Sequence, residues 1–333
     1  MSAAEAHPIL PILEAALAAR QDLFDTQHEG AFRLFNGFYE GDPNLVVDLY
    51  ARTLVIFNYA DPPAQAQATI QAAQNYFLSR LPWVQATVLK TRHATELESR
   101  HGALVYGKLP DRRVREHGVW YAINIQLSQD AGFYLDTRLL RLWTLQNLSG
   151  KTVLDTFAYT GSLGVVARAG GAMRVIYLDL SRKYLNVAKD SYTLNGFPIL
   201  KSDFKAGDFW TQTSRMRRTG ERFDCVLIDP PFFSLTPKGR VDLVRDSTRL
   251  INKVRPLVKP GGLLVAVNNA LFVSGADYLK ALEALCADGY LSIEKLIPVP
   301  EDVTGYSKTI RRPPPVDPSP FNHSTKIAIL KVK

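Results

Sequence analysis

The spacing of apolar positions changes about halfway along the chain. Residues 8–24 repeat apolar side chains every three or four positions, which predicts an amphipathic helix. Short apolar runs separated by turn residues follow from Phe32, and an Ala/Gln-rich helix is predicted at 64–80, before a further strand in WVQATVLKTR. These patterns predict an N-terminal helix and a small α+β domain over residues 1–120.

After about residue 150 the order becomes strand, turn, helix, and this order repeats. The apolar strands are KTVLDTF, RVIYLDL, FDCVLID and GLLVAVNN, and each precedes a helical segment. Such alternation is typical of an α/β fold, a parallel sheet with helices on both faces. The last runs, SIEKLIPV and KIAILKVK, flank the proline-rich segment 313–320 and predict an antiparallel edge. The second predicted domain spans residues 121–333.

Composition restricts the class of protein. Hydrophobic residues make up 46% of the chain and charged residues 22%, which excludes disordered and fibrous classes. Two cysteines cannot build a disulfide framework or a cysteine zinc site, so no metal is implied. No secretion signal or apolar stretch of about 18 residues is evident, so a cytoplasmic location without membrane contact is expected. The net charge of +8 favours a polyanion such as nucleic acid.

Three loops that follow predicted strands carry residues suited to binding a ligand. Their position supports this, because ligands bind at the carboxyl ends of parallel strands. The loop 155–164 contains only part of G-x-G-x-x-G, which disfavours a dinucleotide. Asp179 can accept hydrogen bonds from both ribose hydroxyls. Asp208 offers a carboxylate for an adenine amino group, and Phe209 offers a ring for the base. Together these loops suit an adenosine without phosphates, as in S-adenosyl-L-methionine.

A fourth loop holds the predicted catalytic residues, Asp229, Pro230, Pro231 and Phe232. A turn of this composition presents a carboxylate or carbonyl rigidly beside an aromatic face, so one hydrogen bond and one stack can hold a planar base. Stacking of this kind contributes about 1–3 kcal/mol per base. Four strand-end loops in this order predict a methyltransferase.

Several segments also carry a family resemblance: GFYLDTRLLR, LDTFAYTGSLG, YLDLSRKYLNVAKDSYTLNG, IDPPFFS and VNN. They resemble the class I S-adenosylmethionine-dependent methyltransferases of large-subunit ribosomal RNA, most closely the C-terminal, N7-guanine-methylating half of the bifunctional guanine methyltransferases. The likeness covers about residues 30–270. It implies a Rossmann-like methyltransferase domain, with a mostly parallel seven-stranded sheet and an antiparallel edge, preceded by a small α+β domain that recognises RNA.

The resemblance also implies a set of site residues and partners. The partner would be RNA, 23S rRNA or a large-subunit assembly particle, and the product S-adenosyl-L-homocysteine. The residues expected around the cofactor, from its amino-acid end through its ribose and adenine to the methyl-transfer site, are Phe133, Asp136, Arg138, Asp155, Phe157, Tyr159, Thr160, Gly161, Asp179, Leu180, Asp208, Phe209 and Asp229.

Two departures from the family pattern leave the target base open. The partner half that modifies a guanine amino group is missing, and DPP-Thr-Phe-Ser-Asn becomes DPP-Phe-Phe-Ser-Leu, with bulky Phe232 at the methyl-transfer face. Guanine N7 is the leading site, because its bare lone pair requires positioning and no general base. The alternatives are an exocyclic amine (guanine N2 or adenine N6), with Asp229 as hydrogen-bond acceptor, and cytosine C5.

Cytosine C5 methylation needs a thiolate that adds to the ring. Here Cys225 lies inside a predicted strand, and Asn268-Asn269 occupy the loop where related C5 enzymes carry cysteine. Two further hypotheses about the function stay open: a non-catalytic ribosome-assembly factor that binds cofactor and RNA, and a small-molecule methyltransferase. Three basic clusters could either bind phosphate or form solvated surface: Arg112, Arg113, Arg115 and His117; Arg215, Arg217 and Arg218; Lys308, Arg311 and Arg312.

Overall fold

The computed structural model describes residues 7–333, so residues 1–6 of the predicted first domain lie outside it. The chain divides into two compact units. The first unit runs to Leu135 and includes residues 300–313, and the second contains residues 136–299 and 314–333. Each unit is described separately below.

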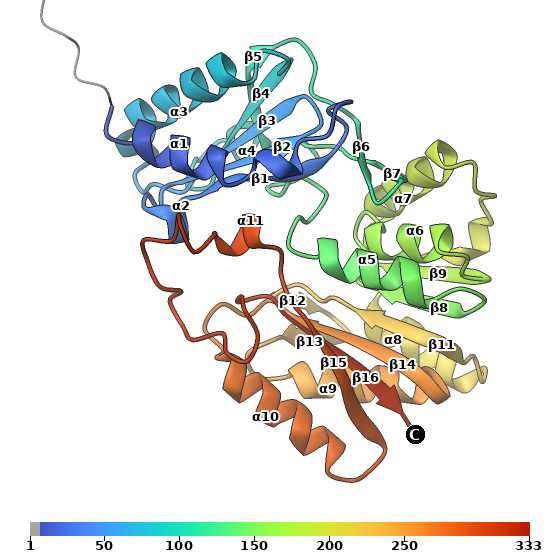
Figure 1. Ribbon diagram of the computed structural model, residues 1–333. Helices are drawn as coiled ribbons and strands as arrows, with labels where there is room; N and C mark the ends of the chain where they lie inside the picture. The colour runs from blue at the N-terminus through green and yellow to red at the C-terminus, as the bar shows by residue number, and fades with distance from the viewer. Residues whose placement is uncertain (1–6) are drawn as a thin grey trace, which may run out of the picture. The chain divides into compact units, whose positions relative to one another are not determined.

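The first unit is built on a five-stranded sheet in the order β1-β2-β3-β4-β5 (Figure 1). Neighbouring strands are antiparallel except β3 and β4, which are parallel because α3 connects them. The strands are β1 (Ala31–Asn36), β2 (Leu45–Tyr50), β3 (Thr53–Asn58), β4 (Ala86–Thr91) and β5 (Ala103–Gly107). The helices are α1 (Leu10–Ala18), α2 (Gly37–Glu40), α3 (Gln67–Arg80), α4 (Leu97–His101) and α11 (Glu301–Thr304), with short turns η1 (Gln21–Leu23) and η2 (Pro63–Ala66).

The predicted helices and strands of the first unit are confirmed because their apolar spacing matches the core they build. Leu13 and Leu17 lie on one face of α1, and Phe77 projects from α3 into the same cluster as Leu34 and Ile56 of the sheet. All five side chains are almost completely buried. Burial of each contributes roughly 1.5–3 kcal/mol relative to exposure.

The first unit extends beyond the boundary expected near residue 120. A hairpin of β6 (Arg113–Glu116) and β7 (Val119–Ala122) follows the sheet. Its backbone is hydrogen-bonded to the segment just before β1, since the N–H of Arg115 donates to the carbonyl of Glu29 at 2.7 Å. Sequence pattern alone missed this hairpin, because its outward positions are arginines rather than turn or apolar residues.

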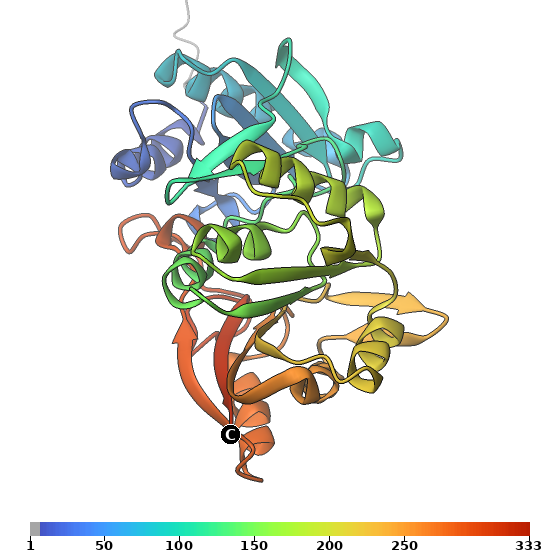
Figure 2. The same ribbon diagram turned by 90° about the vertical axis from the view of Figure 1, so that its right-hand side faces the viewer.

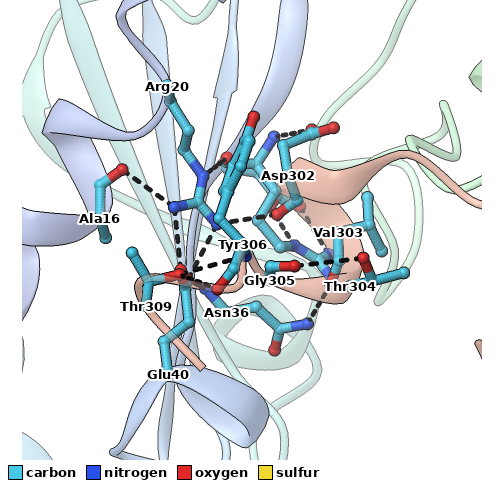
Figure 3. A network of polar contacts seen from close by, with 12 residues as sticks. Ala16, Arg20, Asn36, Glu40, Asp302, Val303, Thr304, Gly305, Tyr306 and Thr309 are labelled. Atoms are coloured by element: carbon cyan, nitrogen blue, oxygen red, sulfur yellow. Dashed lines mark hydrogen bonds and ion pairs between the residues drawn. The ribbon is translucent and has the colours of Figure 1, made fainter. Parts of the chain in front are cut away.

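A buried ion pair explains why residues 300–313 belong to the first unit although they follow the second in sequence (Figure 3). The guanidinium of Arg20 donates to both carboxylate oxygens of Glu40 at 3.0 and 2.9 Å. It also donates to the carbonyl of Asp302 at 2.9 Å, and the Thr309 hydroxyl donates to Glu40. Two elements far apart in sequence thus share one buried polar network.

The second unit contains a seven-stranded sheet in the order β10-β9-β8-β11-β14-β16-β15. The strands from β10 to β14 are parallel, and β16 is antiparallel to both of its neighbours. They are β8 (Thr152–Thr156), β9 (Arg174–Asp179), β10 (Phe204–Ala206), β11 (Phe223–Ile228), β14 (Val258–Asn268), β15 (Leu291–Ile297) and β16 (Lys326–Val332). The predicted mostly parallel sheet with an antiparallel edge is confirmed.

Helices cover both faces of this sheet, as predicted, with α5, α6 and α7 on one face and α8, α9 and α10 on the other (Figures 1 and 2). Their bounds are α5 (Arg138–Asn147), α6 (Ser162–Ala169), α7 (Arg182–Leu194), α8 (Phe209–Arg218), α9 (Ser247–Val254) and α10 (Gly275–Cys286), with short turns η3 (Lys201–Asp203) and η4 (Arg255–Leu257). Leu154, Val226 and Leu264 of three central strands are fully buried between the two layers.

The helix predicted near 241–257 begins only at Ser247. The residues before it form a hairpin of β12 (Phe233–Thr236) and β13 (Gly239–Asp242), which the sequence pattern did not indicate. In the part of the chain that the structure describes, none of the helices has the length and apolar character that crossing a bilayer requires.

Candidate active site

The carboxyl ends of four adjacent parallel strands bring the predicted site residues to one edge of the sheet. Strands β9, β8, β11 and β14 are neighbours in that order. Asp179 ends β9, Asp155 lies near the end of β8, Asp229 follows β11, and Asn268 ends β14. Asp155 lies close enough to Asp229 and Asp179 for their charges to raise its pKa. The strand-end grouping predicted for these residues is thus observed.

The loop after β8 turns tightly because its backbone enters the left-handed region three times. Phe157, Tyr159 and Gly161 have φ values of 56°, 51° and 78°. A side chain at Gly161 would place a Cβ 2.6 Å from the Cβ of Ala188, so only glycine fits there. Non-glycine residues rarely adopt such φ values, and local strain of this kind is typical of ligand-binding loops.

Asp155 anchors this loop to the helix that follows. Its carboxylate accepts a hydrogen bond from the N–H of Gly164 at 2.9 Å, near the start of α6. Burial raises the pKa of Asp155 to about 8, and the charges of Asp229 and Asp179 add to the rise. Its contact with the methionine side of the cofactor stays a prediction.

Asp179 is held in a fixed orientation at the end of β9. One carboxylate oxygen accepts from the N–H of Tyr159 at 2.9 Å and the other from the N–H of Ser181 at 2.8 Å. Burial raises the pKa of Asp179. Each carboxylate oxygen can accept a second hydrogen bond, so two hydroxyl groups can still bind. Leu180 beside it is largely exposed.

Asp208 and Phe209 have clear structural roles at the start of α8. Asp208 caps the helix, accepting from the N–H of Thr211 at 2.9 Å and from the hydroxyl of Thr236 at 2.7 Å. Burial alone would raise the pKa of Asp208, but these hydrogen bonds outweigh it and lower the pKa. The buried ring of Phe209 stacks on Phe157 with centroids 4.5 Å apart. Their contacts with adenine stay predictions.

Asp229 lies near a second carboxyl group, that of Asp136. Burial raises the pKa of Asp229 to about 7, and the charge of Asp136 adds to the rise. One oxygen of Asp136 accepts from the hydroxyl of Thr325 at 2.7 Å, whereas the other, Oδ1, is buried with no hydrogen-bond partner. Pro230 is buried, and the ring of Phe232 is 47% exposed. Two carboxyl groups thus lie close enough for the charge of one to raise the pKa of the other.

Asn269 was noted in the VNN segment but was not among the predicted site residues. Its side-chain amide donates to the carbonyl of Pro230 at 3.4 Å, and its Oδ1 is buried without a partner. The preceding Asn268 accepts from the N–H of Ala270 at 2.9 Å and so shapes the turn after β14. The motif VNN was the available signal, but sequence alone could not show that it contacts the loop of Pro230.

The remaining predicted residues lie in varied surroundings. Thr160 is buried, the ring of Tyr159 lies 4.4 Å from that of Tyr184, and Arg138 begins α5. Phe133 belongs to the first unit, where its ring lies 4.9 Å from the ring of Tyr121. Its predicted approach to the cofactor stays a prediction, as does that of Arg138.

The donor set fits S-adenosylmethionine, which carries an ammonium, a sulfonium and two ribose hydroxyls. Uncompensated carboxylates in a desolvated environment are unfavourable, and a cationic ligand relieves this cost. Asp136 Oδ1 and Asp229 supply acceptors for positive charge, and Asp179 supplies acceptors for hydroxyl groups. Among residues 7–333, no group of three or more His, Cys, Asp or Glu side chains is placed to hold a metal ion.

Comparison with known proteins agrees with this chemistry. The sequence profile of the S-adenosylmethionine-dependent methyltransferases matches residues 39–305. Ribosomal RNA large subunit methyltransferase K/L of Shewanella amazonensis is 32% identical over 272 residues, covering 77% of this chain and 36% of the relative. Ribosomal RNA large subunit methyltransferase I of Klebsiella pneumoniae is 31% identical over 256 residues, covering 76% of this chain and 64% of the relative.

Solved structures show the same fold. A crystal structure of SMU.776 complexed with S-adenosylhomocysteine superposes with a TM-score of 0.83 at 23% identity, covering 97% of this chain and 81% of that chain. The S-adenosylmethionine-dependent methyltransferase from Agrobacterium tumefaciens gives a TM-score of 0.60 at 18% identity, covering 87% of each chain. The Rossmann-like fold expected from the sequence is confirmed.

The chain spans about a third of the length of the K/L relatives and just under two thirds of the type I relative. The match to the profile nevertheless covers most of this chain, including every strand-end loop of the site. It confirms the predicted cofactor, S-adenosylmethionine, and the predicted reaction class, methyl transfer. The chain belongs to the family of S-adenosylmethionine-dependent methyltransferases, in which the curated relatives it resembles are named as ribosomal RNA large subunit methyltransferases.

Proposed function

We propose that the chain methylates a base of large-subunit ribosomal RNA, with guanine N7 as the acceptor atom. The observation that carries the proposal is the loop after β11, where the half-buried Asp229, whose carboxyl has a raised pKa, precedes two prolines and the half-exposed ring of Phe232. The names of the two relatives and the net charge of +8 support an RNA substrate.

The residues of the chain position two reactants rather than form covalent bonds. Bound S-adenosylmethionine supplies a methyl group activated by its sulfonium. Asp179 would hold the ribose, while Asp136 and Asp229 would provide the negative surroundings that favour a cationic ligand. Phe232 would stack on the target base, which must leave a paired helix to be reached.

Guanine N7 suits this site because its lone pair is available without loss of a proton, so alignment of the two reactants suffices. A C5 mechanism is not supported by the positions of the thiols. Cys225 lies within β11, is fully buried, and has a pKa raised by that burial, whereas Cys286 ends α10. Neither cysteine is in a loop at the carboxyl ends of the parallel strands.

Transfer of tritium from labelled S-adenosylmethionine tests the proposal. Unmodified large-subunit rRNA, free or in assembly particles, is incubated with the wild type, with Asp229→Ala and with Asp190→Ala, an exposed carboxylate on α7 as matched control. We expect labelled RNA with the wild type and the control. With Asp229→Ala the rate of label transfer should fall at least about a hundredfold, since removing one preorganised contact at a reacting centre costs about that much. Treatment of the labelled RNA with borohydride and aniline should cleave the strand at N7-methylguanine.

Other outcomes contradict parts of the proposal. Label in N2-methylguanosine or N6-methyladenosine would assign Asp229 to an exocyclic amine and overturn the N7 assignment. Label in free nucleosides or metabolites, but not in RNA, would indicate a small-molecule enzyme. If the wild type binds the cofactor and RNA without transferring label, the chain is a binding factor.

A further inference from the structure

The hairpin β6–β7 of the first unit has one apolar face and one basic, aromatic face. Val114, Val119 and Tyr121 are buried, whereas Arg113 and Arg115 are exposed. Because side chains alternate along a strand, this pattern gives the hairpin two chemically different faces. The outward face carries Arg113, Arg115 and Trp120, and is called the arginine–tryptophan face below.

Two guanidinium groups of this face share one indole ring. The guanidinium carbon of Arg113 lies 4.5 Å from the ring centroid of Trp120, and that of Arg115 lies 5.5 Å from it. Arg115 is the cross-strand neighbour of Trp120 in the antiparallel register, so the hairpin itself sets this contact. Arg115 also forms an ion pair with Glu29 at 3.5 Å, with both side chains partly exposed.

This arrangement holds two guanidinium groups closer together than two freely solvated arginine side chains would be. Guanidinium groups held on one ring repel each other, and the repulsion is relieved when an anion binds between them. A guanidinium stacked on an aromatic ring keeps its N–H edge free and loses less conformational entropy when it donates to a phosphate. A phosphodiester is the anion that matches two such donors together with an aromatic face.

We propose that the arginine–tryptophan face binds the sugar-phosphate backbone of the RNA substrate, apart from the bases that the methyl-transfer site contacts. The inference rests on the proposed rRNA function and adds a second RNA contact, in the first unit. RNA is favoured over an acidic protein surface because the face combines arginines with an aromatic ring and the chain carries a net charge of +8.

The salt dependence of RNA binding tests this inference. The affinity of the full chain for an unmodified large-subunit rRNA transcript is measured by filter binding over a series of KCl concentrations. Each phosphate contact contributes about 0.7–0.9 to the slope of log K against log salt, so Arg113→Gln/Arg115→Gln should reduce that slope by about 1.4–1.8. The matched control is Lys280→Gln/Lys295→Gln, two exposed lysines of α10 and β15, which should leave the slope unchanged.

Two further measurements separate folding and catalysis from RNA contact. Calorimetric affinity for S-adenosylmethionine, which binds the second unit, should be equal in the wild type and both variants. Trp120→Phe, which keeps an aromatic ring, should lower RNA affinity less than Trp120→Ala. At saturating RNA, tritium transfer by Arg113→Gln/Arg115→Gln should reach the wild-type rate, because the proposal assigns this face to the RNA backbone and not to the reacting atoms.

Each contrary result has a distinct meaning. If Arg113→Gln/Arg115→Gln keeps the wild-type slope of log K against log salt, the inference is wrong. If the slope of the control variant falls by the same amount, the effect comes from net charge alone, and the inference is also wrong. An unchanged slope combined with lost binding to assembly particles assigns the face to a ribosomal protein and also overturns it. If the wild type transfers no label to RNA, the proposed function fails whatever the slopes show.

Discussion

The two units of the chain differ in how their charged side chains are paired. In the first unit, Arg20 and Glu40 have fully buried side chains and bind each other, and Arg33 binds Asp48 at 2.7 Å (Figure 3 shows the first pair). In the second unit, Asp229 is half-buried, its pKa is raised by desolvation and by the charge of Asp136, and the buried Oδ1 of Asp136 has no hydrogen-bond partner. A buried carboxylate without a cation is unfavourable for folding.

We propose that this difference separates charges that stabilise the fold from charges that bind the ligand. The first unit supplies a cation for each of these two carboxylates, and the resulting networks hold residues 300–313 against the sheet. The second unit leaves negative charge uncompensated at the strand ends, where a sulfonium and an ammonium would restore balance. Perturbed carboxylates of this kind concentrate at functional sites.

The largest expected effect concerns the buried pair of the first unit. Arg20→Ala leaves Glu40 buried without a cation and should lower the free energy of unfolding by about 3–5 kcal/mol, measured by urea denaturation. Arg80→Ala removes an exposed pair with Glu14 and should cost at most about 1 kcal/mol.

The double variant Arg20→Ala/Glu40→Ala sharpens this result. It should be more stable than Arg20→Ala alone, because no uncompensated charge remains. Equal losses in Arg20→Ala and Arg80→Ala would show that the buried pair adds no more than an exposed one, and the contrast between the units would then lose its basis.

A smaller effect is expected at Asp179, the proposed ribose contact. If Asp179 accepts both ribose hydroxyls, Asp179→Ala removes two charge-assisted hydrogen bonds, of about 1.5–3 kcal/mol each, and should weaken S-adenosylmethionine binding at least about a hundredfold. Isothermal calorimetry measures this, with Asp190→Ala as control and thermal denaturation to show that the variant is folded. Affinity equal to that of the wild type would place the ribose elsewhere.

The smallest expected effect is a pH dependence at Asp229. Its pKa of about 7 means that the carboxyl is mostly protonated at pH 6 and mostly ionised at pH 8. A cationic ligand prefers the ionised form, so affinity for S-adenosylmethionine should rise about tenfold between those pH values if only that form binds. Asp229→Asn should remove this rise. A flat profile in the wild type would show that Asp229 does not sense the cofactor's charge.

The same carboxyl affects folding with the opposite sign. Its folded pKa of about 7 lies above the ordinary carboxyl value of about 3.9, so the folded state holds the proton more tightly. The stability that this proton provides is complete below pH 3.9 and is lost as the pH rises to 7. Asp229→Asn should therefore be more stable than the wild type at pH 8 and should show little gain at pH 4.

The sequence predicted the elements whose signal is local. Alternating strands and helices predicted the parallel sheet of the second unit, and strand-end acids such as Asp179 and Asp229 predicted the ligand edge. The hairpins β6–β7 and β12–β13 were missed, because short strands with polar outward positions have no clear periodicity. The predicted adenine acid, Asp208, also caps α8 and binds Thr236, a contact that depends on the missed hairpin β12–β13.

The sequence by itself determined the fold class, the cofactor chemistry and the order of the strand-end loops, because periodicity and strand-end acids are properties of neighbouring residues. Tertiary structure alone decided which distant groups meet. It joined residues 300–313 to the first unit through Arg20 and Glu40, and it placed Asp136 close enough to Asp229 to raise its pKa. Such pairings bring together residues far apart in the chain, and burial and charge, which act through space, decide their energies.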